Sequence, residues 1–179
     1  MKHTRRTKIR LYIVICVIIL AFLVFDKMRE KRRYGENGIA EASVTTMPQW
    51  TLRDLDGNKI NSKLFKGDVV LITFWSIDCD ACLEEVSVFK DLQTKYGEKG
   101  FKILAVSLDA RDDVDVKGFA RGENINYIVL KGNATMVKKF AHVKEVPESF
   151  LFNRAGDLIY YTLGKIDLDK VNSLIESSL

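Results

Sequence analysis

The stretch WSIDCDACLEEV, which runs from Trp75 to Val86, decides the fold of this chain. It follows DVVLITFW (68–75), whose continuous apolar run has the length of a buried central strand. The residues after Cys79 have helical spacing, and the apolar face of that helix would consist of Cys82, Val86, Phe89 and Leu92. The two cysteines of the stretch therefore fall at a junction between a strand and a helix.

Strand and helix patterns continue on both sides of this junction. Before it, WTLRDLDGNKI (50–60) alternates apolar and polar residues around a turn, which predicts a hairpin. After it, we expect strands over 101–109, over 126–130 and on both sides of a turn at 153–157, and helices over 112–123, over 133–143 with Asn133 as the cap, and over 167–179. This order predicts an α/β fold, with a mixed central sheet that is parallel in its first part and has helices on both faces.

A basic and apolar segment precedes this domain. Residues 1–33 carry 10 Lys and Arg but only 2 Asp and Glu, whereas residues 34–179 carry 18 and 22. The positive charge brackets LYIVICVIILAFLVF (11–25), an uncharged run that also contains Cys16. We therefore expect a basic tail over 1–10, one transmembrane helix over 11–28, a linker over 29–47 and a folded domain over 48–179. Because the basic residues surround an apolar run, they do not indicate a nucleic-acid partner.

The alternative for the apolar run is a cleaved signal peptide, whose apolar region has about this length. An uncleaved signal-anchor is favoured, because the following residues, DKMREKRR (26–33), are charged and bulky and offer no small-residue cleavage site. Five basic residues lie on each side of the run, so the positive-inside rule gives no orientation. The orientation has to be inferred from the chemistry of the domain.

The position of Cys79 at a helix N-terminus indicates redox chemistry. Unpaired N–H groups and the positive end of the helix dipole stabilise a thiolate there. Cys82 is three residues on and lies on the same helix face, so its sulfur can reach that of Cys79. The spacing predicts an exposed nucleophile, Cys79, and a partner, Cys82, that resolves a mixed disulfide.

Other chemistries remain open for this pair. A zinc site would need two further ligands, and copper delivery would need soft or imidazole ligands, for which His142 is the only candidate in the domain. A peroxidase would use Cys79 alone, but no proline-led loop precedes it. Two inert core thiols, or a domain that binds partners without catalysis, would also fit the pattern.

Pro147 is one of only two prolines in the chain and stands immediately before a predicted strand, in KEVPESFLFN. A proline cannot donate to the strand ladder, so it marks a sheet edge or a special turn. An ordinary trans turn would satisfy this pattern. The sharper hypothesis is a cis Val146–Pro147 bond beside the cysteines.

Taken together, FWSIDCDAC, Glu85, EVPESFLFNRAGDLI, and the hairpin with LFKGDVVLITFW resemble the membrane-anchored thioredoxin-like proteins of the TlpA/ResA/DsbE type. The resemblance covers roughly 48–179. It implies a thioredoxin-like fold with an N-terminal hairpin, in which Cys79 attacks, Cys82 resolves and a cis Pro147 faces them. Glu85 matches an acid that aids proton transfer in the family; the alternative is a solvated helix-face glutamate.

The resemblance also implies a substrate-binding surface made of Trp75, Asp78, Val146 and Pro147, where the backbone of Val146 would pair with an extended substrate segment. It implies no cofactor beyond the Cys79–Cys82 disulfide. The implied partners are disulfides or thiols of extracytoplasmic proteins, with apocytochrome c as one example, and a membrane electron donor. The anchored domain would then face the extracytoplasmic side, periplasmic or outer, where disulfides persist.

The chain departs from the family around the first cysteine. Asp78 replaces an aromatic residue, and Asp80-Ala81 between the cysteines includes no proline. Together with Glu84 and Glu85, these acids disfavour the thiolate of Cys79. A less stabilised reduced form has a lower reduction potential, so we expect a reductant more than an oxidant.

Overall fold

The structure, a computed structural model, describes residues 18–22, 39, 42, 44–109, 113–140, 143 and 145–179. Of the expected transmembrane helix, residues 18–22 are described and are helical, while Cys16 lies outside the described residues. No helix in the described ranges combines the length and the apolar character that crossing a membrane requires. The anchor over 11–28 therefore stays a prediction.

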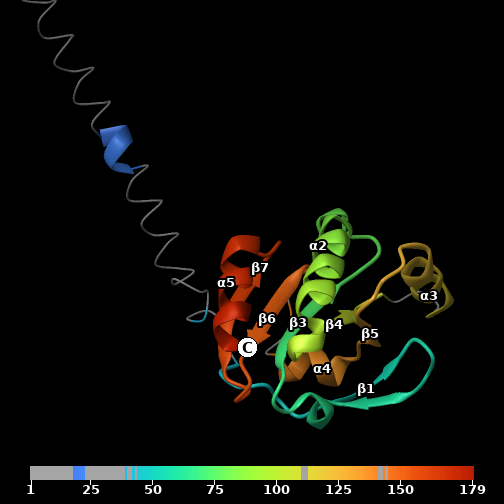
Figure 1. Cartoon of the computed structure of the whole chain (residues 1–179). Coiled ribbons are helices and arrows are strands. Elements are labelled where there is room, and N and C mark those ends of the chain that lie inside the picture. Colours follow the sequence, from blue (N-terminus) through green and yellow to red (C-terminus); the bar gives the residue numbers. More distant parts are fainter. Residues whose placement is uncertain are drawn as a thin grey trace, which may run out of the picture.

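Seven strands form one mixed sheet (Figure 1). In chain order they are β1 (Thr51–Asp54), β2 (Lys59–Asn61), β3 (Val69–Trp75), β4 (Phe101–Ser107), β5 (Ile128–Lys131), β6 (Glu148–Phe152) and β7 (Leu158–Leu163). Their spatial order is β2-β1-β5-β4-β3-β6-β7. The pairs β3–β4 and β4–β5 are parallel, and all other pairs are antiparallel. The predicted hairpin and the predicted sheet, parallel in its first part, are both confirmed.

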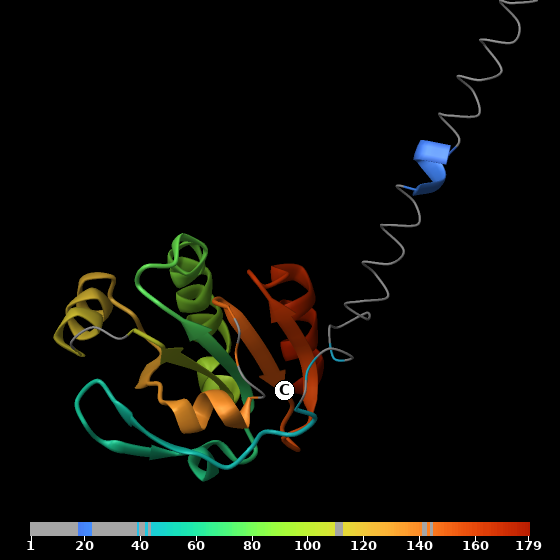
Figure 2. The same cartoon turned by 180° about the vertical axis from the view of Figure 1, so that it is seen from behind.

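Helices cover both faces of the sheet, as expected. They are α2 (Asp80–Tyr96), α3 (Asp113–Gly122), α4 (Ala134–Lys139) and α5 (Leu168–Ser178), with short 3-10 turns η1 (Ser62–Phe65) and η2 (Gly97–Lys99). Figures 1 and 2 show α2 and α5 side by side on one face and α4 on the other. Asn133 caps α4 as predicted, because its Oδ1 accepts the backbone N–H of Met136 at 2.8 Å.

The helix predicted over 133–143 is shorter than expected and ends at Lys139. Phe140 leaves the helical conformation, with φ −97° and ψ 25°, and buries its ring against the sheet. Its ring centroid lies 5.2 Å from that of Phe74 and 5.0 Å from that of Phe150. The free energy gained from burying this ring outweighs another helical turn.

Strand β3 is buried along its whole length and separates the two halves of the core. Val70, Ile72 and Phe74 face α4, whereas Val69 and Leu71 pack against the apolar sides of α2 and α5. This two-sided burial explains the continuous apolar run of the strand. It also fixes where β3 ends, and hence where the cysteines begin.

The N-terminal segment joins the domain at the opposite end of the sheet from Cys79. The N–H of Met47 donates to the Gly156 carbonyl at 2.8 Å, and the N–H of Leu158 donates to the Thr45 carbonyl at 2.9 Å. These contacts lie at the β6–β7 turn, which is next to the start of β3 because Val70 pairs with Phe152. Cys79 follows the other end of β3.

Arg154 connects three segments at this end of the sheet. Its guanidinium donates to the carbonyls of Gly67 at 3.2 Å, Lys99 at 3.0 Å and Ser178 at 3.2 Å. An ammonium group cannot reproduce this planar fork, so Arg154→Lys should lower the free energy of unfolding by about 1–2 kcal/mol. Urea unfolding of the purified protein measures the change.

The matched control is Arg53→Lys, since the Arg53 guanidinium donates, among the described residues, only to the Gly57 carbonyl of its own hairpin. We expect the control to cost less than about 0.5 kcal/mol. Equal losses in both variants would mean that Arg154 does not connect the three segments energetically.

Candidate active site

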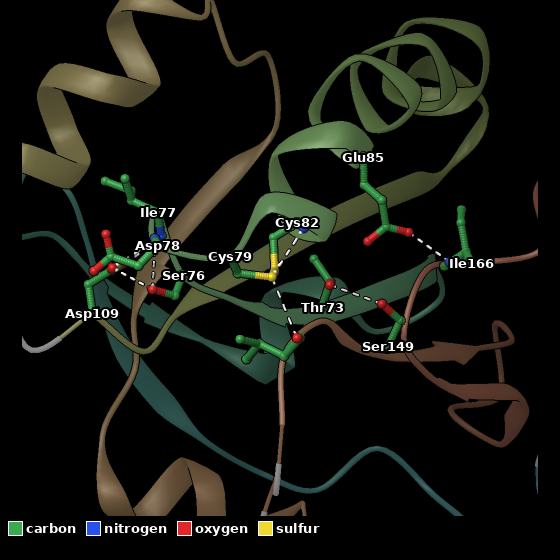
Figure 3. Close-up of a disulfide and its surroundings, with 11 residues drawn as sticks. Thr73, Ser76, Ile77, Asp78, Cys79, Cys82, Glu85, Asp109, Ser149 and Ile166 are labelled. Atoms are coloured by element: carbon green, nitrogen blue, oxygen red, sulfur yellow. Dashed lines mark hydrogen bonds between the residues drawn. A yellow bond between two sulfur atoms is a disulfide. The ribbon is translucent and has the colours of Figure 1, made fainter.

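Cys79 is the N-cap of α2 and sits directly beyond the central strand. It has extended backbone angles, φ −109° and ψ 102°, and the helix starts at Asp80. The backbone N–H of Cys82 donates to Cys79 Sγ at 3.2 Å (Figure 3). A sulfur at this position receives an N–H group of the first turn and the positive end of the helix dipole, and both stabilise a thiolate.

The two sulfurs form a disulfide and differ in their exposure. The Cys79–Cys82 bond joins Cα atoms 5.2 Å apart. Cys82 is 4% exposed and lies on the buried face of α2, whereas Cys79 is half-buried at the surface. A partner from solution can therefore approach Cys79 more readily than Cys82, in agreement with the expected order of reaction.

The Val146–Pro147 peptide bond is cis, as the sharper sequence hypothesis had it. The carbonyl oxygen of Val146 lies 3.5 Å from Cys79 Sγ. Pro147 is buried immediately before β6, the antiparallel neighbour of β3. Residues 67 positions apart in the chain thus meet at one end of the sheet.

Glu85 is buried behind the disulfide, at 3% exposure, so the alternative of a solvated helix-face residue is wrong. Its Oε1 accepts the backbone N–H of Ile166 at 2.7 Å, whereas Oε2 has no hydrogen-bond partner among the described residues. A cavity of about 10 Å³ adjoins both Glu85 and Cys82, and Thr73, Trp75 and Tyr127 also line it. That volume corresponds to about one water molecule.

Burial raises the pKa of Glu85 from 4.5 to about 7, against the opposing effects of the Ile166 N–H group and the charge of Lys165. The carboxyl group is therefore close to half protonated at neutral pH. A group in this condition both takes up and releases protons, which is what exchange between a thiol and a disulfide requires of a neighbouring acid.

The four acids of the sequence argument lie in different environments. Asp78 and Asp80 are exposed on either side of Cys79. Glu84 is also exposed, but its Oε2 forms an ion pair with Lys165 Nζ at 2.6 Å. Glu85 is buried and partly protonated. The negative charge near Cys79 is thus smaller than four carboxylates would give.

Trp75, which we expected in the substrate-binding surface, lies beneath it. The residue is 5% exposed because its ring packs on Phe119, with centroids 5.7 Å apart, and alongside Cys82 in the same apolar cluster. Trp75 therefore supports the site from below. Asp78, Val146 and Pro147 lie around the cysteines, with Pro147 itself buried.

The sequence reasoning missed Asp109, which follows β4. Its carboxylate accepts hydrogen bonds from the hydroxyls of Ser76 at 2.7 Å and Ser107 at 2.8 Å. A signal for it existed, because β3 and β4 are consecutive parallel strands, and the residues that follow two such strands meet at one edge of the sheet.

No group of three or more His, Cys, Asp or Glu in the described part of the chain could hold a metal ion. His142, the candidate for a copper ligand, lies outside the described residues.

Comparisons with known proteins show the family of this chain. The model of the AhpC/TSA family matches residues 44–161. The thiol-disulfide oxidoreductase ResA of Bacillus thuringiensis subsp. konkukian is 33% identical over 118 residues, which cover 66% of this chain and 68% of the relative. ResA of Bacillus subtilis is 26% identical over 165 residues, covering 92% and 88%.

Solved structures have the same fold. A thiol:disulfide interchange protein from Bacteroides sp. superposes with a TM-score of 0.65 at 26% identity, covering 76% of this chain and 90% of that one. A thioredoxin family protein from Chlorobium tepidum gives 0.69 at 18% identity, covering 76% and 97%, and supports the fold alone.

The chain belongs to the AhpC/TSA family, within the thioredoxin-like fold. Its relatives of the ResA type make it a thiol–disulfide oxidoreductase, as the resemblance implied.

The raised pKa of Glu85 makes stability depend on pH. Between about pH 4.5 and pH 7 only the folded state binds this proton, so the free energy of unfolding falls as pH rises, and above about pH 7 the loss is complete. Glu85→Gln keeps an acceptor for Ile166 and removes the charge. In the oxidised protein it should therefore stabilise more at pH 8 than at pH 4.5, by up to about 3 kcal/mol.

Urea unfolding at the two pH values measures this difference. Glu84→Gln alters an exposed carboxylate on the same helix and should not reproduce it. An equal effect of Glu85→Gln at both pH values would mean that Glu85 is ionised in the folded protein throughout this range.

Proposed function

We propose that this protein is a membrane-tethered reductant of disulfides in extracytoplasmic proteins. The observation that carries the proposal is the asymmetry of the pair: Cys79 Sγ is half-buried and accepts the N–H of Cys82, whereas Cys82 is 4% exposed. Such an arrangement suits one attacking sulfur and one resolving sulfur.

The reaction proceeds in two exchanges. The Cys79 thiolate attacks one sulfur of the substrate disulfide, which forms a mixed disulfide and releases the first substrate thiolate. The Cys82 thiolate then attacks Cys79 Sγ, which releases the second substrate thiolate and leaves the Cys79–Cys82 disulfide. Two electrons pass to the substrate, and a membrane electron donor returns them to the pair. Beyond this disulfide the reaction needs no cofactor.

Glu85 would take the proton of Cys82 in the second exchange. Two observations support this role: the cavity that adjoins both residues, and the lack of a hydrogen-bond partner for Oε2 in the described part of the chain. A pKa of about 7 suits a group that must accept a proton and later return it near neutral pH.

The substrate would bind along the Val146–Pro147 segment. The Val146 carbonyl lies beside Cys79 Sγ, so an extended segment that pairs with this backbone would bring its own disulfide to the nucleophile. Asp78, exposed on the other side of Cys79, would contact the same partner.

The helix predicted over 11–28 would hold the domain on the oxidising side of the membrane, where disulfides persist. Residues 45–47 join the domain at the end of the sheet opposite to Cys79. Apocytochrome c is one substrate that the family resemblance suggests.

Trapping tests the proposed order of attack. In a Cys16→Ser background, Cys82→Ser should accumulate a mixed disulfide between Cys79 and a substrate protein, because the resolving sulfur is missing. Cys79→Ser should accumulate none. Non-reducing electrophoresis with mass spectrometry identifies the linked cysteine, and trapping through Cys82 alone would reverse the roles.

The rival functions give other outcomes. A peroxidase would consume peroxide with Cys82→Ser as fast as with both cysteines. A protein that only binds partners would retain them without any mixed disulfide in either variant. Copper handling would give stoichiometric copper on the reduced protein, and this copper would be lost with Cys79→Ser.

Equilibration against defined thiol buffers tests the direction of electron flow. We expect a reduction potential near or below about −270 mV, because Asp78 and Asp80 disfavour the Cys79 thiolate. Asp80→Asn should raise the potential by about 10–20 mV, since a nearby surface charge contributes about 0.5–1 kcal/mol. Asp91→Asn, an exposed site farther along the same helix, is the control. A potential near about −120 mV would make the protein a disulfide donor.

A further inference from the structure

The carboxylate of Asp109 bridges the ends of two parallel strands. On one side it accepts the hydroxyl of Ser107, in β4, at 2.8 Å. On the other it accepts the hydroxyl of Ser76, which follows β3, at 2.7 Å. It also accepts the backbone N–H of Ile77, at 3.1 Å to Oδ1 and 3.3 Å to Oδ2. Figure 3 shows Asp109 beneath this segment.

The contacts continue from Ser76 to the nucleophile. The Ser76 hydroxyl oxygen accepts the backbone N–H of Asp78 at 3.2 Å, and the Ser76 carbonyl accepts the N–H of Cys79 at 3.3 Å. Ser76 and Asp109 therefore hold the connection between β3 and α2 together, because Asp109 accepts both the Ser76 hydroxyl and the Ile77 N–H. Residues 76–79 pair with no strand, so side-chain oxygens accept backbone N–H groups there that a neighbouring strand would otherwise accept.

We propose that Asp109 is a positioning residue for the nucleophile: through Ser76 it fixes the connection that holds Cys79 Sγ at the N-terminus of α2. The inference rests on the proposed role of Cys79 as the attacking residue, and it adds a residue outside the Cys-x-x-Cys stretch that controls its reactivity.

Geometry gives the reason. The Cys82 N–H group and the helix dipole stabilise the Cys79 thiolate only while Sγ stays at the cap, because these interactions fall off within one turn. When the connection is free to move, Sγ spends less time there and the thiolate is less stabilised. Less thiolate at a given pH means slower attack.

Asp109 also carries a charge, and a negative charge disfavours the thiolate. Removing the carboxylate therefore has two opposing effects on Cys79, one through position and one through charge. Ser76→Ala separates them, because it removes the hydroxyl contact to Asp109, keeps the backbone contact of Ile77, and leaves every charge in place. A double-mutant cycle between Ser76 and Asp109 then isolates their coupling.

The readout is the thiol pKa of Cys79 in the reduced full-length protein, from the pH dependence of its alkylation by iodoacetamide, followed at the Cys79 peptide by mass spectrometry. We expect Ser76→Ala to raise this pKa by about 0.5 or more, which slows alkylation about threefold well below the pKa. In an Asp109→Ala background, Ser76→Ala should change it by less than about 0.2. Ser76→Thr, which keeps the hydroxyl, should restore the original value.

Asp54→Ala is the control for general destabilisation. Asp54 accepts the backbone N–H groups of Asp56 and Asn58 in the hairpin, so its loss should lower the melting temperature without moving the pKa of Cys79. Equal shifts from Ser76→Ala in both backgrounds, no shift in either, or a shift with Asp54→Ala would each overturn the proposal.

Failure of the proposed function gives a different result. Should Cys79→Ser exchange a model disulfide at the full rate, Cys79 would not be the attacking residue, whatever the cycle gives. If Cys79→Ser abolishes exchange but the double-mutant cycle shows no coupling between Ser76 and Asp109, only the proposed role of Asp109 would be wrong.

Discussion

The hydrogen bond from the Cys82 amide to Cys79 Sγ is the interaction on which the site depends. It exists because β3 is buried on both faces and ends at Trp75, four residues before the N-cap of α2. The strand fixes the position of the helix start, and the helix start fixes the electrostatics of the sulfur. In the middle of a helix, every nearby backbone N–H already donates to a carbonyl of the preceding turn, so a cysteine sulfur there could not accept one.

The same geometry places the two sulfurs in different surroundings. Cys79 faces solvent and the Val146 carbonyl, whereas Cys82, one turn on, faces the core and the cavity beside Glu85. Burial raises the pKa of Glu85 to about 7, and its Oε2 has no hydrogen-bond partner within the described ranges. The apolar packing that stabilises α2 thus also raises the pKa of the carboxyl group in its second turn.

Strong local patterns made most of the fold predictable from the sequence. The apolar run of β3, the hairpin turn and the Asn133 cap are each specified by adjacent residues, and all are present. The early end of α4 was not predictable, because Phe140 leaves the helix to pack on strands distant in sequence. The resemblance pointed to Glu85, but its burial and the partners of Asp109 depend on tertiary packing, which the spacing of neighbouring residues does not report.

The charge around Cys79 shows what tertiary structure adds to a sequence argument. Four neighbouring carboxylates suggest a strongly disfavoured thiolate, but Lys165 neutralises Glu84, and burial leaves Glu85 close to half protonated at neutral pH. Asp78 and Asp80 are exposed and lie next to the N-cap. In the proposed mechanism, the helix N-terminus raises the reduction potential and the two surface acids lower it. The helix N-terminus and each acid contribute on the order of 1 kcal/mol to the stability of the thiolate. The acids therefore outweigh the helix N-terminus only when both of them act on the sulfur.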